Sequence, residues 1–198
     1  MSPHSEMPSA VVSAETCEYS AAERKLLLRL AHDSIELALS GRERDLDLTP
    51  PNPHLAGPRG AFTTLHLQGN LRGCIGYIHP VESLYKTVAA TARAAAFEDP
   101  RFEPVTLPDL AELKVEISVL SPPRPIRPNE VVVGKHGLIV TKGNHRGLLL
   151  PQVPMEWEWD RETFLAQTCL KAGLPSDAWQ HGAQLQGFTA EVFGESDC

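Results

Sequence analysis

The chain has 198 residues, of which 42% are hydrophobic and 22% are charged, as in an ordinary globular domain that can bury a core of its own. Its formal net charge of −7 argues against a protein that binds nucleic acid by neutralising phosphates. No stretch approaches the roughly 18 apolar residues that a membrane span requires.

The N-terminal part of the chain is expected to be a lead-in followed by a helix. Residues 1–19 form the predicted disordered lead-in, and Met1–Ala10 lacks the apolar segment of a secretory leader. Ser20 and Glu23 then have the spacing of a capping box, in which each side chain bonds the backbone N–H of the other. Apolar residues follow at helical spacing, and Gly41 ends the helix.

A loop, a hairpin and a second helix are expected next. Residues 45–60 are rich in proline and predict a long loop. The β-hairpin is predicted over Ala61–Ile78, with its turn at Gly69-Asn70. The helix has Pro80 as its first residue, and it ends at Asp99-Pro100 because the residue before a proline disfavours helix.

The middle of the chain is predicted to return to β-structure. Apolar and polar side chains alternate over Leu113–Leu120, which predicts a strand with one buried face. Residues 121–128 hold four prolines and are expected to be an extended connector. A second hairpin is predicted over Gly137–Leu150, turning at Gly143-Asn144.

The C-terminal part is predicted to hold one helix and one strand. Asp160 caps the helix, which ends at Gly173 ahead of Pro175, and Gln184–Phe193 is the last strand. Because the helices follow antiparallel hairpins instead of alternating with parallel strands, the pattern predicts an α+β fold of antiparallel hairpins flanked by helices.

Two stretches share a pattern: Gly69-Asn70-Leu71-Arg72-Gly73 recurs as Gly143-Asn144-His145-Arg146-Gly147. Each lies at a predicted hairpin turn and is followed by a proline and then a helix. A duplicated hairpin–helix unit explains the recurrence, and so does the suitability of Gly-Asn for tight turns. In a true duplication, Cys74 corresponds to Leu148.

The most distinctive motif is the hexapeptide Leu71-Arg72-Gly73-Cys74-Ile75-Gly76. With four further stretches in the same order, it makes residues 20–194 resemble the AMMECR family, also called AmmeMemoRadiSam system protein A. Residues 1–19 and 195–198 fall outside the resemblance. The four stretches are Ala95-Ala96-Phe97-Glu98-Asp99-Pro100-Arg101-Phe102, Glu116-Ile117-Ser118-Val119-Leu120, Leu149-Leu150-Pro151-Gln152-Val153 and Cys169-Leu170-Lys171-Ala172-Gly173-Leu174.

The resemblance implies one AMMECR-type domain over residues 20–194, an α+β protein with a larger and a smaller subdomain. It also implies an association with a Memo-like protein and a radical S-adenosylmethionine protein, as in bacteria and archaea. The hexapeptide is the family's expected functional site. No agreed reaction accompanies it, and the cofactor is unknown.

The predicted hairpin gives the hexapeptide a geometry. With a two-residue turn at Gly69-Asn70, Cys74 faces Leu65, and Arg72 lies on the same face of the sheet. A guanidinium this close to a thiol stabilises the thiolate. His66 lies on the other face and cannot readily serve Cys74 as base or metal partner, unless a bulge shifts the register.

Two readings of Cys74 stay open. Gly73 and Gly76 flank it, and glycines in a strand suggest a bulge or the close approach of a ligand or of backbone, so both are candidate ligand-binding residues. The alternative is a buried cysteine acting as a small hydrophobe beside Leu65. Residue chemistry alone favours the packed cysteine, and the resemblance favours a functional one.

Two polar residues are further candidates. Glu116 lies on the polar face of its strand and is predicted to assist proton transfer, with Arg72 as one possible partner; the alternative is an exposed face of the sheet. Gln152 follows a hairpin and a proline and is a candidate for binding a ligand through its amide; the alternative is a turn residue.

The four cysteines form no C-x-x-C pair and have no histidine at metal-ligand spacing, so no metal site is predicted. Reduced thiols are expected in the cytoplasm. The first hypothesis, which the resemblance favours, is an enzyme or enzyme component with a small-molecule ligand. In it, Cys74 is the nucleophile or a thiolate that binds the ligand, Arg72 orients an anionic group and Glu116 assists proton transfer. The alternative is a non-catalytic adaptor that docks the two partner proteins.

Overall fold

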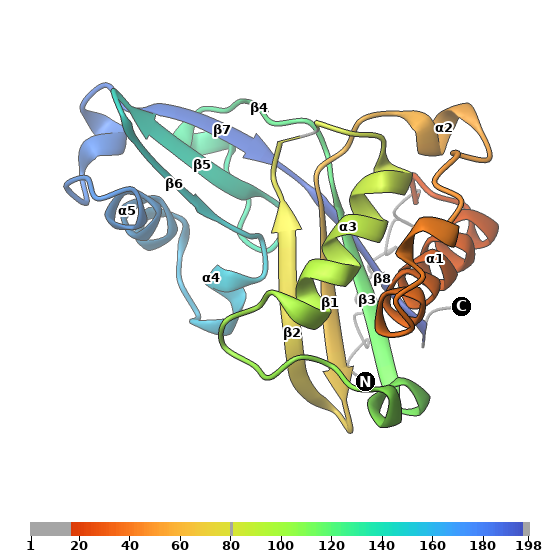
Figure 1. The fold of residues 1–198 in the computed structure, drawn as a ribbon. Helices are drawn as coiled ribbons and strands as arrows, with labels where there is room; N and C mark the ends of the chain where they lie inside the picture. The colour runs from red at the N-terminus through yellow and green to blue at the C-terminus, as the bar shows by residue number, and fades with distance from the viewer. Residues whose placement is uncertain (1–16, 80, 196–198) are drawn as a thin grey trace, which may run out of the picture.

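The computed structural model describes residues 17–79 and 81–195, which form two four-stranded antiparallel sheets with helices packed against them (Figure 1). The first sheet has the strand order β2-β1-β3-β8, and the second has the order β4-β7-β5-β6. The predicted α+β fold is therefore confirmed, with the larger unit around the first sheet.

The strands are β1 (Ala61–Leu67), β2 (Asn70–Tyr77), β3 (Leu113–Leu120), β4 (Arg124–Pro125), β5 (Gly137–Lys142), β6 (His145–Leu149), β7 (Gln184–Phe188) and β8 (Ala190–Gly194). The α-helices are α1 (Ala21–Leu39), α2 (Pro53–Ala56), α3 (Leu84–Phe97), α4 (Val153–Glu156) and α5 (Arg161–Lys171). Short 3₁₀ turns lie at Glu43–Asp45, Leu107–Ala111, Pro128–Glu130 and Ala178–Gln180.

The first helix begins where the capping box predicts. The Ser20 hydroxyl accepts the N–H of Glu23 at 3.3 Å, and the Glu23 carboxylate accepts the N–H of Ser20 at 3.0 Å. Burial raises the pKa of Glu23, but hydrogen bonds from Ser20 and His54 outweigh it and lower that pKa to about 2. Tyr19, placed in the lead-in by sequence, is buried and stacks on His54; residues 1–16 lie outside the described part of the chain.

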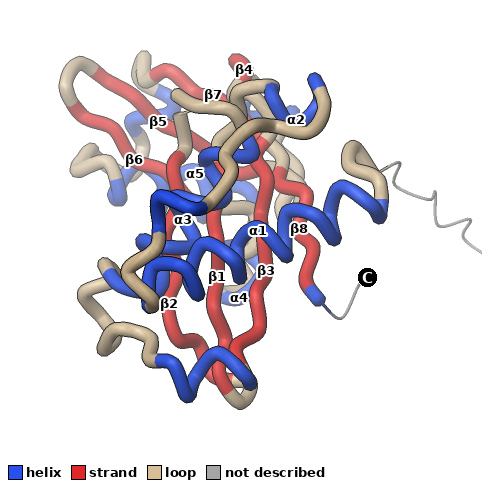
Figure 2. Tube along the Cα trace, turned by 45° about the vertical axis from the view of Figure 1, so that its right-hand side comes forward, coloured by secondary structure: helices blue, strands red, loops and turns tan. Residues whose placement is uncertain are grey.

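Helices α1 and α3 cover one face of the first sheet, as Figure 2 shows. Alanines along α3 let its backbone approach the strands closely, and Ala92 and Ala95 are buried there. The prediction that this helix begins at Pro80 is wrong, because α3 begins at Leu84. Ser83 caps the helix, and its hydroxyl accepts the N–H of Lys86. Pro80 itself lies outside the described residues. Val81, next to it, precedes the helix and is 84% exposed.

The last predicted strand is in fact two strands in different sheets. β7 pairs with β5, and after Thr189 the chain crosses to β3 as β8. Phe188 and Phe193 explain the crossing, because the first packs between the two sheets with Leu120 and Ile139, and the second packs under α1 and α3. The two sheets are thus connected by the continuous chain from β7 to β8 and by the hydrophobic cluster that contains Phe188.

The two hairpins and the helices that follow them are built alike. A Cβ atom on Gly73 of β2 would lie 2.1 Å from the Ala95 carbonyl oxygen of α3. A Cβ on Gly147 of β6 would lie 2.4 Å from the backbone nitrogen of Ala172, at the end of α5. The backbone near the end of α3 thus packs against Gly73, and the backbone at the end of α5 packs against Gly147, the corresponding glycine of the second hairpin. This likeness supports the duplication, in which Cys74 corresponds to Leu148.

Candidate functional site

The hairpin of β1 and β2 turns one residue earlier than predicted and contains a bulge. The turn residues are Gln68 and Gly69, both with positive φ (51° and 79°), so Leu67 pairs with Asn70. The register shifts between Leu65 and His66, which pair with Gly73 and Leu71 respectively, and Arg72 is the extra residue. The predicted pairing of Cys74 with Leu65 is therefore wrong.

Past the bulge, Cys74 faces Thr64. Thr64 also pairs with Glu116 on β3, so the three residues form one row across β2, β1 and β3. We call the side of the sheet that carries this row the Cys74 face; it lies opposite α1 and α3, because Leu65 and its alternate neighbours on β1 are buried against those helices. The Thr64 hydroxyl donates to the half-buried Cys74 Sγ over 3.3 Å.

The bulge also brings His66 to the Cys74 face. His66 lies two residues from Thr64 on β1 and is half-buried. A diagonal neighbour in an antiparallel pair has its Cα about 7–8 Å away, within reach of a long side chain. The expectation that His66 lies on the opposite face from Cys74 is wrong. The sequence analysis named a bulge as the one feature that could change this, and the structure contains that bulge.

Arg72 does not lie beside Cys74. As the bulged residue it points to the segment after α3, where Nη2 donates to the Pro104 carbonyl at 2.9 Å and Nη1 donates to the Glu103 carbonyl. Its Nη2 is also 3.7 Å from Asp109 Oδ2. The same-face pairing expected for Arg72 and Cys74, and an ion pair between Arg72 and Glu116, are thus not found; the guanidinium anchors a loop.

Two residues that sequence reasoning passed over hold Cys74 instead. β2 is the outer strand of its sheet, so its free edge lacks a neighbouring strand. Asp99 Oδ2 accepts the Cys74 N–H at 2.9 Å, and Arg101 Nη2 donates to the Cys74 carbonyl at 3.4 Å. Nothing in the spacing of Asp99 and Arg101 along the sequence indicates that a strand lies against them.

The Asp99 carboxylate is buried and strongly paired. Its side chain is 2% exposed, and it accepts Arg101 Nε at 2.9 Å and Nη2 at 2.7 Å in addition to the Cys74 N–H. The Arg101 guanidinium holds the pKa of the Asp99 carboxyl well below its usual range, against burial, which raises it. Asp99 in turn raises the pKa of Arg101.

The flanking glycines make room for the protein itself. Gly73 is occupied from the helix side by the backbone of α3, as described above. A Cβ on Gly76 would lie 2.2 Å from the ring of Phe62, its partner on β1. The close approach that the glycines predicted is therefore made by the α3 backbone at Gly73 and by the Phe62 ring at Gly76. A ligand-binding role for the two glycines stays a prediction.

Glu116 and Gln152 lie in different surroundings. Glu116 is half-buried in the row with Cys74, and its carboxylate makes no hydrogen bond within residues 17–79 and 81–195. Gln152 is exposed at the start of α4 and does not cap that helix. The structure thus aligns Glu116 with Cys74 but shows no contact between Gln152 and that row.

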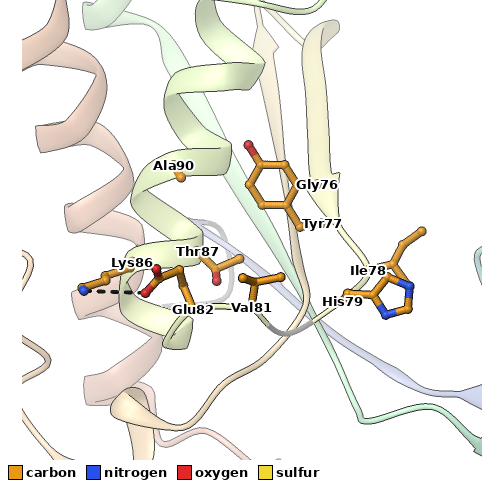
Figure 3. Close-up of a pocket in the computed structure, with 9 residues that line it drawn as sticks. All are labelled: Gly76, Tyr77, Ile78, His79, Val81, Glu82, Lys86, Thr87 and Ala90. Carbon is orange, nitrogen blue, oxygen red and sulfur yellow. Dashed lines mark ion pairs between the residues drawn. The ribbon is translucent and has the colours of Figure 1, made fainter.

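An apolar cavity of about 460 Å³ adjoins the hexapeptide at the far end of β2 (Figure 3). It is lined by Gly76, Tyr77, Ile78, His79, Val81, Glu82, Lys86, Thr87 and Ala90. In the close-up, Glu82 and Lys86 form an ion pair at one side of it, at 3.6 Å. The cavity is large enough for a small molecule or an apolar side chain.

Within the described residues, no group of three or more His, Cys, Asp or Glu side chains is arranged to hold a metal ion. Cys169 is fully buried in the hydrophobic cluster of the second sheet. No helix in the described part of the chain combines the length and apolarity needed to cross a membrane.

Comparison with known proteins gives consistent matches along most of the chain. The sequence model of the family described as AMMECR1 matches residues 28–193. A protein of Thermococcus gammatolerans is 48% identical over 187 residues, covering 86% of this chain and 89% of that protein, and protein PF1979 of Pyrococcus furiosus is 46% identical over 187 residues, covering 86% and 87%. The crystal structure of the uncharacterised protein PH0010 from Pyrococcus horikoshii matches with a TM-score of 0.76 and 44% identity, covering 87% of this chain and 91% of that one.

Proposed function

The chain belongs to the AMMECR1 family, and from this premise we propose that it is a cytoplasmic enzyme or enzyme component whose ligand site lies on the Cys74 face of the first sheet. The observation that supports this most is the hydrogen bond from the Thr64 hydroxyl to the half-buried Cys74 sulfur. The Thr64 hydroxyl gives the sulfur a hydrogen-bond donor on the side that faces Glu116, the third residue of the row. A cysteine that only fills core space has no need of either group.

The chemistry proposed is nucleophilic. The Cys74 sulfur adds to an electrophilic carbonyl carbon of a small-molecule ligand, and the C=O π bond breaks as its electron pair moves to the oxygen. Because Glu116 is two strands from Cys74, the thiol proton passes to the Glu116 carboxylate through the Thr64 hydroxyl, which lies between the two residues in the row. The Thr64 hydroxyl stabilises negative charge on the sulfur by hydrogen bonding. His66 is the other group on this face able to accept a proton, and the bulge at Arg72 is what makes it available.

We expect Cys74 to react with iodoacetamide in the folded protein, in a Cys17→Ser/Cys198→Ser background where Cys169 serves as a buried internal control. Thr64→Val should slow the labelling of Cys74 about fivefold, the effect of one hydrogen bond of about 1 kcal/mol. Glu116→Gln should flatten the pH dependence of labelling. Mass spectrometry of the separated peptides measures both effects.

Thr63→Val is the matched control, because the Thr63 hydroxyl bonds Thr91 of α3 at 2.8 Å and therefore lies on the face of the sheet opposite the Cys74 row. It should leave the labelling rate of Cys74 unchanged. If Cys74 stays as protected as Cys169 until the protein unfolds, Cys74 is a packed residue and the nucleophile role is lost.

The apolar cavity favours a second function, that of a non-catalytic adaptor for a Memo-like protein and a radical S-adenosylmethionine protein. Tyr77 and Val81 line the cavity and are 47% and 84% exposed, and exposed apolar side chains gathered in one place are typical of a docking surface. Co-purification of the three proteins that is lost in Val81→Glu but kept in Cys74→Ser supports the adaptor. Co-purification that survives Val81→Glu removes it.

A further inference from the structure

The free edge of β2 is held at Cys74 by a pair of side chains and not by another strand. Asp99 binds the Cys74 N–H, and Arg101 binds both oxygens of Asp99 through Nε and Nη2. A buried carboxylate needs such partners, because an unpaired charge in the interior is strongly destabilising. Asp99 is thereby fixed, and it fixes the plane of the Arg101 guanidinium.

Part of that guanidinium is left for a ligand. The Arg101 side chain is 56% exposed and lies over the ring of Phe102, with its central carbon 5.2 Å from the ring centroid. Nε and Nη2 are used on Asp99, whereas Nη1 makes no hydrogen bond to any residue that the structure describes. Arginine presents its donors in a rigid fork that suits carboxylate and phosphate oxygens. The unused Nη1 donors are therefore available at the surface.

The contacts of Arg101 with Asp99 and Cys74 also fix where its Nη1 donors lie relative to Cys74. Arg101 Nη2 is 3.4 Å from the Cys74 carbonyl oxygen, so the guanidinium lies directly beside that residue on the strand edge. Arg72, the cation that the sequence favoured, is turned toward the carbonyls of Glu103 and Pro104. Glu116, whose charge opposes an anion, is two strands away, about 10 Å from Cys74.

We infer that Arg101, oriented by Asp99, binds an oxyanion of the ligand beside Cys74, so that the ligand is a small molecule carrying a carboxylate or phosphate group. This inference rests on the proposed function for its view of Cys74 as the reacting group. Asp99 is a positioning residue, because it acts on the ligand only through Arg101. Since the guanidinium is already held in place, no side-chain freedom has to be lost when the anion arrives.

The test compares two alkylating reagents that differ in charge. Iodoacetate is an anion and iodoacetamide is neutral, so the ratio of their rates at Cys74 reports the positive charge beside the sulfur. In the Cys17→Ser/Cys198→Ser background, Arg101→Gln should lower the iodoacetate-to-iodoacetamide ratio roughly tenfold. Arg101→Lys should retain most of the preference, because it keeps the charge. A purely structural role for Arg101 changes both rates together and leaves the ratio alone.

Two further arginine variants make the result specific. Arg127→Gln removes an arginine that also pairs with an acid nearby in sequence, Glu130, but far from the site along the chain, and should leave the ratio unchanged. Arg72→Gln should also leave it unchanged. If Arg72→Gln lowers the ratio and Arg101→Gln does not, or if neither does, the inference is wrong.

A second measurement does not depend on thiol reactivity. In Cys74→Ser, inorganic phosphate should raise Tm above its value in chloride at the same ionic strength, and this rise should vanish when Arg101→Gln is added. A phosphate effect that survives Arg101→Gln, or that is absent from Cys74→Ser, overturns the anion site. An unreactive Cys74 with an Arg101-dependent phosphate effect overturns the proposed nucleophile and leaves the anion site standing.

Discussion

Gly73→Ala is expected to lower the free energy of unfolding by about 2–4 kcal/mol, because the added methyl group has no room. The new Cβ would lie 2.1 Å from the carbonyl oxygen of Ala95 and 3.0 Å from its carbonyl carbon. Both atoms belong to the backbone of α3, so no side-chain rotation relieves the contact, and the helix or the strand must move. Urea denaturation followed by circular dichroism measures the change.

Gly69→Ala is the control on the same hairpin. Gly69 has a φ of +79° and open space around its Cβ position, so this variant carries only the cost of a left-handed residue, about 1 kcal/mol. Gly147→Ala should resemble Gly73→Ala, since its Cβ would lie 2.4 Å from the Ala172 nitrogen. Equal costs for Gly69→Ala and Gly73→Ala would show that α3 does not press on the hexapeptide.

Asp99→Asn is expected to cost about 2–3 kcal/mol, because it weakens hydrogen bonds made by a charged group and leaves Arg101 without its partner. The variant keeps one oxygen for the Cys74 N–H, so the fold should persist. The loss is smaller than for a fully buried ion pair, since the half-exposed Arg101 side chain can be solvated. Thermal and urea unfolding at neutral pH give its size.

The same variant should change the response to acid. Arg101 holds the pKa of Asp99 below its usual range in the folded protein, whereas an aspartate in the unfolded chain has a pKa of about 3.9. The ionised form is thus favoured by folding, so the contribution of Asp99 is complete above that pH and is lost as the pH falls toward the folded pKa. Between about pH 5 and pH 2 the wild type should lose more stability than Asp99→Asn. Parallel curves for the two proteins would contradict this.

The parts of the fold that local chemistry decides could be predicted. The capping box at Ser20, the strand Leu113–Leu120, the turn at Gly143-Asn144 and the cap at Asp160 all appear as expected. In each case the signal and the structure it specifies lie within a few residues of each other. The break between β7 and β8 is different, because Phe188 and Phe193 of the single predicted strand pack into two separate hydrophobic clusters.

The geometry of the site could not be predicted, because it depends on a shift of one residue. Gln68-Gly69 and Gly69-Asn70 both suit a tight turn, and the observed turn is at Gln68-Gly69. Arg72 is then an extra residue in β2 and forms a bulge. A shift of one residue moves every following side chain to the other face of a strand. Cys74 therefore lies with Thr64 and His66, and the arginine beside it is Arg101, which is brought there by the path of the chain after α3.

The central claim is that the bulge places Cys74 opposite Thr64, and a disulfide trap tests it most directly. The Cys74 N–H points to Asp99 and away from β1, so Thr64 and Cys74 form a non-hydrogen-bonded pair, in which side chains are closest. In the Cys17→Ser/Cys198→Ser background, mild oxidation of Thr64→Cys should link that residue to Cys74, and Leu65→Cys should stay unlinked. Linkage through Leu65→Cys without linkage through Thr64→Cys would restore the register predicted from the sequence and contradict the site described above.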